Sequence, residues 1–317
     1  MTNFIKEISL EYYYQYKAKY FILLVLALLF LSAFVVNSQF MLTKSTLENY
    51  KHIEEIYRRD KIDINDALND ELNLKRPDSN TEVVDNYLKY EHLNYQNSLI
   101  ALNPINAINQ LFSSVCLIIL PIIFSMYSIC VAHYDIKYKI LKVLLINKSF
   151  IKYHINKVAS ILVVILLSIL GISIFHSINQ MIVFKFFTRI DPSVPNIDDS
   201  IFSVSFADKI PIQILFVLII NIFFSILFYF ASVFTRSIIL PSSILFIYMF
   251  LVPNMGKFDI KNIILYSVPK IFNTKATLFS THTGKEFPIY YIFFWITILI
   301  FFSLTVVYIS DKRSKYY

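Results

Sequence analysis

The sequence predicts an all-α integral membrane protein with six transmembrane helices, and its composition and charge pattern carry this prediction. Of 317 residues, 56% are hydrophobic and 17% are aromatic, with 30 Phe, 22 Tyr and only 3 Gly. A soluble domain rarely carries such an apolar load. Every Lys, Arg, Asp and Glu lies between the long apolar runs and none lies inside them. Because ionisable groups are costly in hydrocarbon, a bilayer imposes this segregation.

The chain begins with a predicted N-terminal interfacial helix over residues 1–19, followed by a first span over residues 20–40. Apolar and aromatic side chains recur at helical spacing in the first segment, at Phe4, Ile5, Ile8 and Tyr12. This pattern is typical of a helix that lies at the membrane surface. A cleaved secretory signal is the competing interpretation. Acidic residues before the long apolar run, and no small-residue cleavage site after it, argue against a signal.

Residues 41–110 form the one large polar segment between spans, and we expect a small helical extracellular domain there. Acidic residues exceed basic ones, and Leu, Ile and Tyr recur at roughly helical spacing. Ser45 and Asp63 are candidate helix starts, and Pro77 interrupts the pattern. The segment carries no ligand-binding motif, so a solvated cap is its simplest interpretation.

The remaining apolar runs define five further spans and the connections between them. The predicted spans cover residues 111–132, 158–184, 211–234, 238–252 and 288–309. The connections are residues 133–157, outer loops at 185–210 and 253–287, and a tail at 310–317. Within the second outer loop, residues 259–272 predict a short helix that lies on the outer leaflet or dips into it, because they are too few to cross.

The charge distribution predicts that both termini are cytoplasmic. Lys and Arg concentrate in the cytoplasmic connections of membrane proteins. The segments expected inside carry a net charge of +9, and those expected outside carry −2. The loop at residues 253–287 is discordant, since it is expected outside and carries +3. The total bias is large enough to keep this topology, which is that of a multi-pass protein of the cell membrane.

The segment at residues 133–157 is the most informative part of the sequence. Six lysines accompany a single acid, Asp135, and the segment contains no Gly or Pro. Apolar residues lie among the lysines, which predicts a short amphipathic helix under the membrane. A connecting loop that rests on lipid headgroups is the alternative. The apolar residues outnumber what an idle loop needs, so we favour a helix on which another protein docks.

Motifs of catalysis and metal binding are absent from the sequence. It has no glycine-rich nucleotide loop, no His-Glu-x-x-His, no cysteine pair at zinc spacing and no nucleophile elbow. Cys116 and Cys130 lie in one apolar run, about 21 Å apart on a helix, which is too far for a disulfide. We therefore expect no catalytic residue, metal or bound cofactor. The location of the basic residues also argues against a nucleic-acid partner.

Taken in order, these elements resemble the permease subunit of ABC-2 type transporters. That family has an N-terminal interfacial helix, a span, an outer domain, a second span, a basic cytoplasmic helix and four more spans. Its local signature includes an acid, a Gly-Thr, a leucine pair, a proline and a closing lysine near the start of span three. Asp135, Leu144, Leu145 and Lys157 match parts of this signature with a one-residue gap, and the Gly-Thr and the proline are replaced.

The resemblance implies a subunit that exports its substrate with energy from a separate ATPase. Family members dimerise through their spans, as homodimers or heterodimers, and the complex carries two ATPase subunits that bind ATP and Mg²⁺. The residues expected to couple the ATPase to the spans are Asp135, Lys137, Leu141, Lys142, Leu144, Leu145, Lys148 and Lys157. The leucines would fill a groove on the ATPase, and lysines would meet acids at its rim.

The substrate is predicted only as a class. Few charges and abundant Phe, Tyr, Ile and Leu favour an amphipathic or hydrophobic cargo, such as a peptide, bacteriocin, toxin or drug. The excess of Ile, Lys, Asn, Phe and Tyr over Ala and Gly is typical of an AT-rich genome, most often of a Gram-positive bacterium. Candidate pathway-lining residues are Asn37, Gln39, His176, Asn179, Asn221 and Ser225. Ordinary hydrogen bonding between helices is the alternative for each.

Two other classes of membrane protein remain open. One is a sensor or assembly protein whose outer helical domain binds a ligand and signals through the cytoplasmic helix. The other is a secondary transporter, which is poorly supported because no carboxylate lies inside the spans to relay ions. A neighbouring reading frame with a phosphate loop would favour the exporter, and its absence would favour the sensor.

Overall fold

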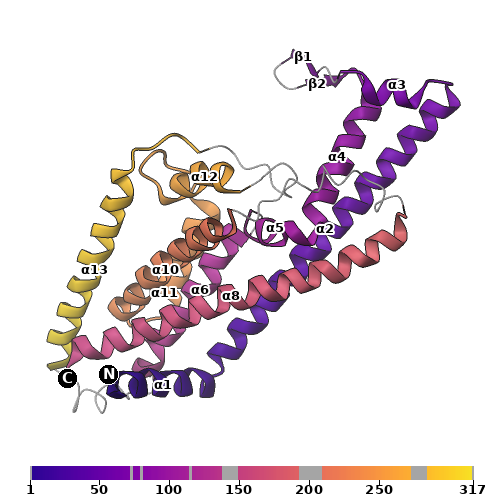
Figure 1. The fold of residues 1–317 in the computed structure, drawn as a ribbon. Helices are drawn as coiled ribbons and strands as arrows, with labels where there is room; N and C mark the ends of the chain where they lie inside the picture. Colours follow the sequence, from indigo (N-terminus) through magenta and orange to yellow (C-terminus); the bar gives the residue numbers. More distant parts are fainter. Residues whose placement is uncertain are drawn as a thin grey trace.

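Long helices dominate the computed structural model of the chain (Figure 1). The structure describes residues 2–71, 74–78, 81–113, 116–137, 149–192, 209–272 and 284–315. The helices are α1 (Thr2–Lys17), α2 (Tyr20–Arg59), α3 (Ile64–Asn69), α4 (Tyr87–Leu102), α5 (Ala107–Ser113), α6 (Cys116–Lys137), α8 (Phe150–Ile190), α10 (Ile210–Thr235), α11 (Ile239–Phe246), α12 (Ile260–Ile271) and α13 (Tyr290–Lys315). A 3₁₀ turn (Pro104–Asn106) precedes α5, and a π-helical turn (Ile247–Leu251) continues α11. Strands β1 (Leu74–Asp78) and β2 (Thr81–Val84) form one antiparallel hairpin.

Five helices within the described residues are long and apolar enough to cross a membrane. They are Tyr20–Arg59, Leu117–Tyr134, Phe150–Ile190, Ile210–Thr235 and Tyr290–Lys312. The structure is therefore compatible with the predicted all-α, multi-pass membrane protein. The predicted span at residues 238–252 corresponds instead to a shorter apolar helix, Ile239–Leu251. At ~1.5 Å per residue this helix is about 20 Å long, less than the ~30 Å of a hydrocarbon core.

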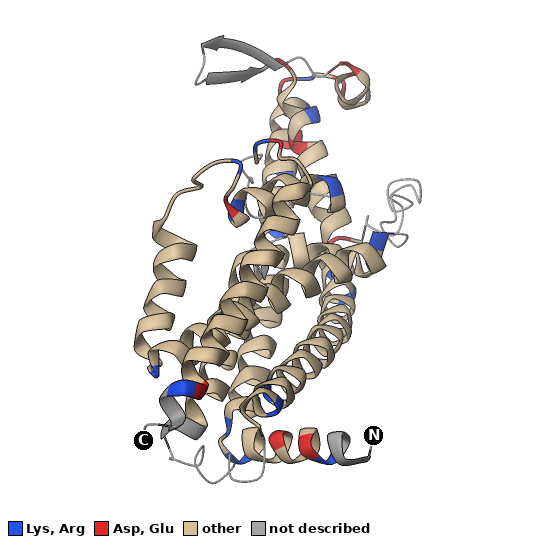
Figure 2. Ribbon diagram, turned by 90° about the vertical axis from the view of Figure 1, so that its left-hand side faces the viewer, with Lys and Arg blue, Asp and Glu red and all other residues tan. Residues whose placement is uncertain are grey.

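Charged residues gather towards the two ends of the bundle and leave its middle mostly apolar. Figure 2 shows this distribution, with a long tan zone between the coloured ends. Both termini lie at one end, beside α1, whereas α12 and the hairpin lie at the other (Figure 1). We call the first the inner end and the second the outer end. This arrangement is expected for helices that cross a bilayer.

A sharp turn separates α1 from α2. Lys19, between the two helices, has a left-handed backbone conformation with φ 62°. As a result α1 lies across the inner end, whereas α2 rises through the bundle (Figure 1). With no Gly or Pro in it, α2 runs unbroken for 40 residues, about 60 Å. It therefore continues past residue 40 into the outer segment, and the prediction that Ser45 starts a helix is wrong.

The main core lies where α6 packs against α10. Leu120, Phe124 and Ile129 of α6 are fully buried. Val217 and Phe224 of α10 are each only 1% exposed. By contrast, α13 packs on the outside of α10, and only 6% of its apolar window is buried. The apolar face of α13 is thus left for lipid or for another protein.

The outer domain is built largely from continuations of the spanning helices. The outer part of α2 packs against α4, and the end of α8 joins them (Figure 1). A second core between these helices consists of Leu47, Tyr95, Leu99, Leu102 and Phe187. The domain is therefore continuous with the bundle.

Of two local features in the outer domain, the N-terminal cap of α3 was predicted from the sequence and the β1–β2 hairpin was not. Asp63 accepts a hydrogen bond from the Asn65 amide at 2.8 Å and so caps α3, as expected. The β1–β2 hairpin was missed, because the helical spacing of the rest of the segment was extended across it. Its second strand is Thr-Glu-Val-Val, and such β-branched residues favour strands.

A buried hydrogen bond joins α4 to the end of α8. The Tyr95 hydroxyl donates to Asp191 Oδ2 at 2.5 Å, and both side chains are at most 4% exposed. Burial, together with this bond, raises the pKa of the Tyr95 phenol. The hydroxyl therefore remains a donor throughout the physiological pH range.

We expect Tyr95→Phe to lower the free energy of unfolding by about 1.5–3 kcal/mol, because a buried carboxylate loses a hydrogen-bond donor. Thermal melting in detergent micelles, followed by circular dichroism, measures the change. Tyr87→Phe is the matched control, since Tyr87 is on the same helix and 47% exposed. Equal melting temperatures for the two variants would contradict the assigned role.

Candidate functional site

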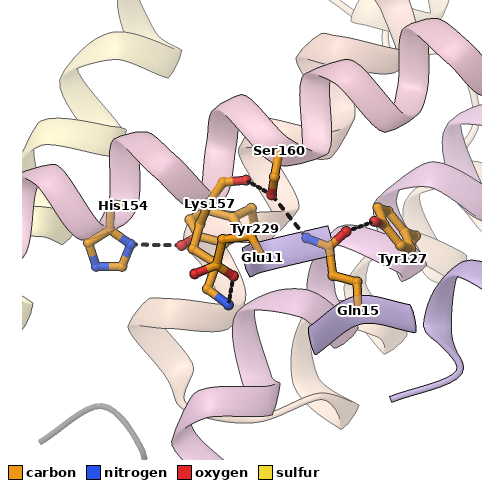
Figure 3. A network of polar contacts seen from close by, with 7 residues as sticks. All are labelled: Glu11, Gln15, Tyr127, His154, Lys157, Ser160 and Tyr229. Atoms are coloured by element: carbon orange, nitrogen blue, oxygen red, sulfur yellow. Dashed lines mark hydrogen bonds and ion pairs between the residues drawn. The ribbon is translucent and has the colours of Figure 1, made fainter. Parts of the chain in front are cut away.

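Polar side chains from four helices meet at the inner end of the bundle, where α1 crosses α8 (Figure 3). The network comprises Glu11 and Gln15 of α1, Tyr127 of α6, His154, Lys157 and Ser160 of α8, and Tyr229 of α10. None of these residues is more than 7% exposed. Buried polar groups cost free energy unless they are partnered, so the contacts within the network decide what it can do.

An ion pair between α1 and α8 is the centre of this network. Lys157 Nζ lies 2.5 Å from Glu11 Oε2, and both side chains are shielded from solvent. The Lys157 ammonium also lies 5.8 Å from the centre of the Tyr153 ring. At this separation the attraction between the charges offsets much of their desolvation cost, but loss of either partner leaves an expensive buried charge. The pair therefore holds α1 to the bundle.

Hydrogen bonds on either side bring two more helices into the contact. Gln15 Nε2 donates to Ser160 Oγ at 2.9 Å, and the Tyr127 hydroxyl donates to Gln15. His154 Nδ1 lies 2.8 Å from the Tyr229 hydroxyl. The network thus connects α1 to both α6 and α8, and it connects α8 to α10.

Helical spacing explains how α1 contacts α8 at several points. Glu7, Glu11 and Gln15 follow one another at intervals of four, which places them on one face of a helix. Glu7 accepts a hydrogen bond from Asn156, and its Oε1 lies 3.2 Å from Lys152 Nζ. This polar face was not predicted, because the helix was inferred from the apolar residues of the segment, although its polar residues also recur every fourth position.

The expected coupling residues fall in different parts of the structure. Lys157 lies inside the bundle, so its ammonium holds α1 and is not presented to a partner protein. Asp135 and Lys137 belong to the last turn of α6, where the structure describes the backbone alone. The others lie outside the described residues: Leu141, Lys142, Leu144, Leu145 and Lys148.

The helix expected at residues 1–19 forms as α1, which covers Thr2–Lys17. Ile8 and Tyr12 are half-buried, and Tyr12 packs against the main core. Phe4 and Ile5 belong to the helix, but their side chains lie outside the described part of the structure. One face of α1 is therefore attached to the bundle, while Tyr13 and Tyr16 are more than half exposed.

Two candidate pathway residues hold helices together in the outer half of the bundle. Gln39 Nε2 donates to the Ser98 carbonyl oxygen at 3.1 Å. His176 Nδ1 lies 3.2 Å from Ser32 Oγ, which joins α8 to α2. All four side chains are buried. In these contacts Gln39 and His176 form hydrogen bonds between helices, which was the alternative to lining a pathway.

Two other candidates belong to a buried polar stripe along α10. Gln213, Asn221, Ser225 and Ser232 lie eight, four and seven residues apart, on one face of the helix. Ser232 donates to the Ile129 carbonyl of α6 at 3.4 Å, so this face points towards α6. Among the described residues, Asn221 Oδ1 and Ser225 Oγ have no hydrogen-bond partner. Gln213 and Ser232 were not predicted, although their spacing from Asn221 and Ser225 places all four residues on one helix face.

The last two candidates, Asn37 and Asn179, lie together in the outer half of the bundle. They line an open-sided hollow of about 410 Å³ between α2 and α8. In the described residues, no group of three or more His, Cys, Asp or Glu is placed to hold a metal ion. The chemistry offered by these sites is ion pairing and hydrogen bonding.

No protein-family model matches the sequence, and no curated protein or solved structure matches it. The class therefore rests on the sequence and structure of the chain itself. The chain forms a helical bundle compatible with a multi-pass membrane protein. At its inner end a buried polar network joins a surface helix to the helices of the bundle.

We expect Lys157→Met to lower the free energy of unfolding by about 3–5 kcal/mol, because Glu11 stays buried after losing its cation. The double variant Glu11→Leu/Lys157→Met should recover most of this loss, since neither charge remains. Chemical unfolding in detergent micelles gives both values. Lys152→Met is the control, because that side chain is 53% exposed and its ion pair contributes about 0–1 kcal/mol. A double variant no more stable than Lys157→Met would show that the two charges are not coupled.

Proposed function

We propose that this chain is the membrane subunit of an ATP-driven exporter of the ABC-2 type, powered by a separate ATPase. The ion pair between Glu11 and Lys157 is the observation that supports the proposal most. The basic segment at residues 138–148 connects the end of α6 to the start of α8. Both of those helices take part in the network. A partner that binds this segment would therefore act on α1, α6, α8 and α10 together.

The length of two helices supports transmission across the membrane. α2 has 40 residues and α8 has 41, so each extends about 60 Å without interruption. At the outer end they are joined through α4, by the second core and by the bond from Tyr95 to Asp191. A displacement imposed at the inner end would move the outer domain with it, as an exporter requires.

In this proposal the chain crosses the membrane six times, with both termini in the cytoplasm of a Gram-positive bacterium. Termini at the same end of the bundle require an even number of crossings (Figure 1). The short helix Ile239–Leu251 would supply the sixth. Lys261 Nζ donates to the Val252 carbonyl oxygen at 2.7 Å. This bond satisfies a backbone acceptor where the short helix ends, which suits a helix that stops inside the outer leaflet.

The cargo proposed from composition is an amphipathic or hydrophobic peptide, toxin or drug. A second permease copy, or a related permease, would cover part of the exposed face of α13, whose apolar window is only 6% buried. ATP and Mg²⁺ would be bound by the two ATPase subunits.

A membrane sensor is the second candidate function. The unbroken α2 favours it, because this helix links the outer domain directly to the turn between α1 and α2. A sensor of this kind would signal to a partner without ATP turnover. The two candidates therefore differ in whether an ATP-hydrolysing subunit is bound.

We expect the double variant Leu144→Asp/Leu145→Asp to reduce ATP turnover of the exporter complex about tenfold or more, because two charges would enter an apolar docking groove. The measurement is ATPase activity of the chain co-purified with its ATPase and reconstituted in liposomes. Ile62→Asp is the matched control, since Ile62 is 48% exposed in the outer domain.

Unchanged co-purification and turnover in the double variant would contradict the coupling role. Absence of any ATP-hydrolysing subunit would favour the sensor. Transport that persists without ATP and collapses with the proton gradient would indicate a secondary transporter.

A further inference from the structure

The hollow between α2 and α8 combines an apolar lining with two carboxamides. Its lining includes Val36, Asn37 and Phe40 of α2 and Asn179, Ile182 and Phe186 of α8. The rings of Phe40 and Phe186 lie 6.0 Å apart, so aromatic surface from both helices meets there. A volume of about 410 Å³ falls within the ~300–1,000 Å³ typical of ligand sites.

The two carboxamides are available to a ligand. Asn37 is exposed and Asn179 is partly exposed, and neither side chain is bonded within the part of the chain that the structure describes. Amide groups that face hydrocarbon without partners are costly. A ligand that offers carbonyl oxygens would accept hydrogen bonds from both.

The position of Asn37 along α2 indicates the depth of the hollow. Asn37 lies 17 residues beyond Tyr20, where the apolar run begins. At ~1.5 Å per residue this is about 26 Å across a hydrocarbon core of ~30 Å. The carboxamides therefore lie close to the outer edge of the core, where the ester carbonyls of lipids are found.

A basic residue lies further outward on the same face of each helix. Lys44 follows Asn37 by seven residues, and Arg189 follows Ile182 by seven, an interval that returns to the same helix face. Arg189 is exposed, and the Lys44 side chain is 48% exposed, with its Nζ 3.8 Å from Glu48 Oε1. Cations at this level favour anionic headgroups.

We propose that the hollow binds one anionic glycerophospholipid of the outer leaflet. One acyl chain lies along Val36 and Ile182, and the ester carbonyls accept hydrogen bonds from Asn37 and Asn179. The phosphate is attracted by the two cations beyond them. Lipid binding at this site needs no ATPase, so the experiment below tests it independently of the proposed function. The lipid would sit between the two long helices and so favour one spacing of them.

Native mass spectrometry of the full chain, taken from bicelles of equal phosphatidylglycerol and phosphatidylcholine with identical acyl chains, tests this site. We expect one retained lipid per chain, with phosphatidylglycerol favoured at least about fivefold. Asn37→Leu/Asn179→Leu should lower retention of both lipids about tenfold, since two hydrogen bonds are lost. Lys44→Ala/Arg189→Ala should abolish the preference for phosphatidylglycerol.

Asn49→Leu/Lys51→Ala is the matched control, because both residues are exposed on the outer part of α2. Ala33→Phe, which places a ring in the hollow, should block retention. Circular dichroism and gel filtration identify any variant that fails to fold. If Ala33→Phe fails to fold, the retention measured for Asn37→Leu/Asn179→Leu tests the proposal. Equal retention of the two lipids by the unmodified chain, or retention unchanged by the asparagine pair, would overturn the proposal.

Discussion

The ion pair between Glu11 and Lys157 is the constraint on which the inner end of the molecule depends. It joins a helix that lies across the bundle to one that runs through it, over a contact only 2.5 Å long. Because both charges are buried, neither helix can move away without exposing or isolating a charge. The pair therefore converts α1 from a surface helix into part of the bundle.

The molecule has polar contacts at both ends and apolar packing between them. At the inner end the Gln15–Ser160 bond extends the ion pair, and at the outer end Tyr95 and Asp191 join α4 to α8. The long helices α2 and α8 connect these two regions. A structure of this kind transmits displacement along its axis, and the hollow between the two helices lies on that route.

Particular residues show where prediction from sequence succeeded and where it failed. Lack of Gly and Pro between residues 20 and 59 allows one helix, but the change from apolar to polar composition at residue 40 suggested a boundary. Composition marks where the solvent changes, whereas a helix ends only where its backbone is interrupted or capped. Asp63 was identified because its cap is local: the carboxylate bonds to an amide two residues away.

The sequence by itself predicted a class with which the structure is compatible, and it located most of the apolar helices. It could do so because the bilayer requirement acts on composition and charge within single segments. Only the tertiary structure decided the role of Lys157, which sequence assigned to a partner and which the fold pairs with Glu11. The fold also places Asn37 and Asn179, two of the six candidate pathway residues, in one hollow. Such pairings join residues more than a hundred positions apart. The spacing of residues within one segment does not predict these pairings, because they depend on which helix faces pack together.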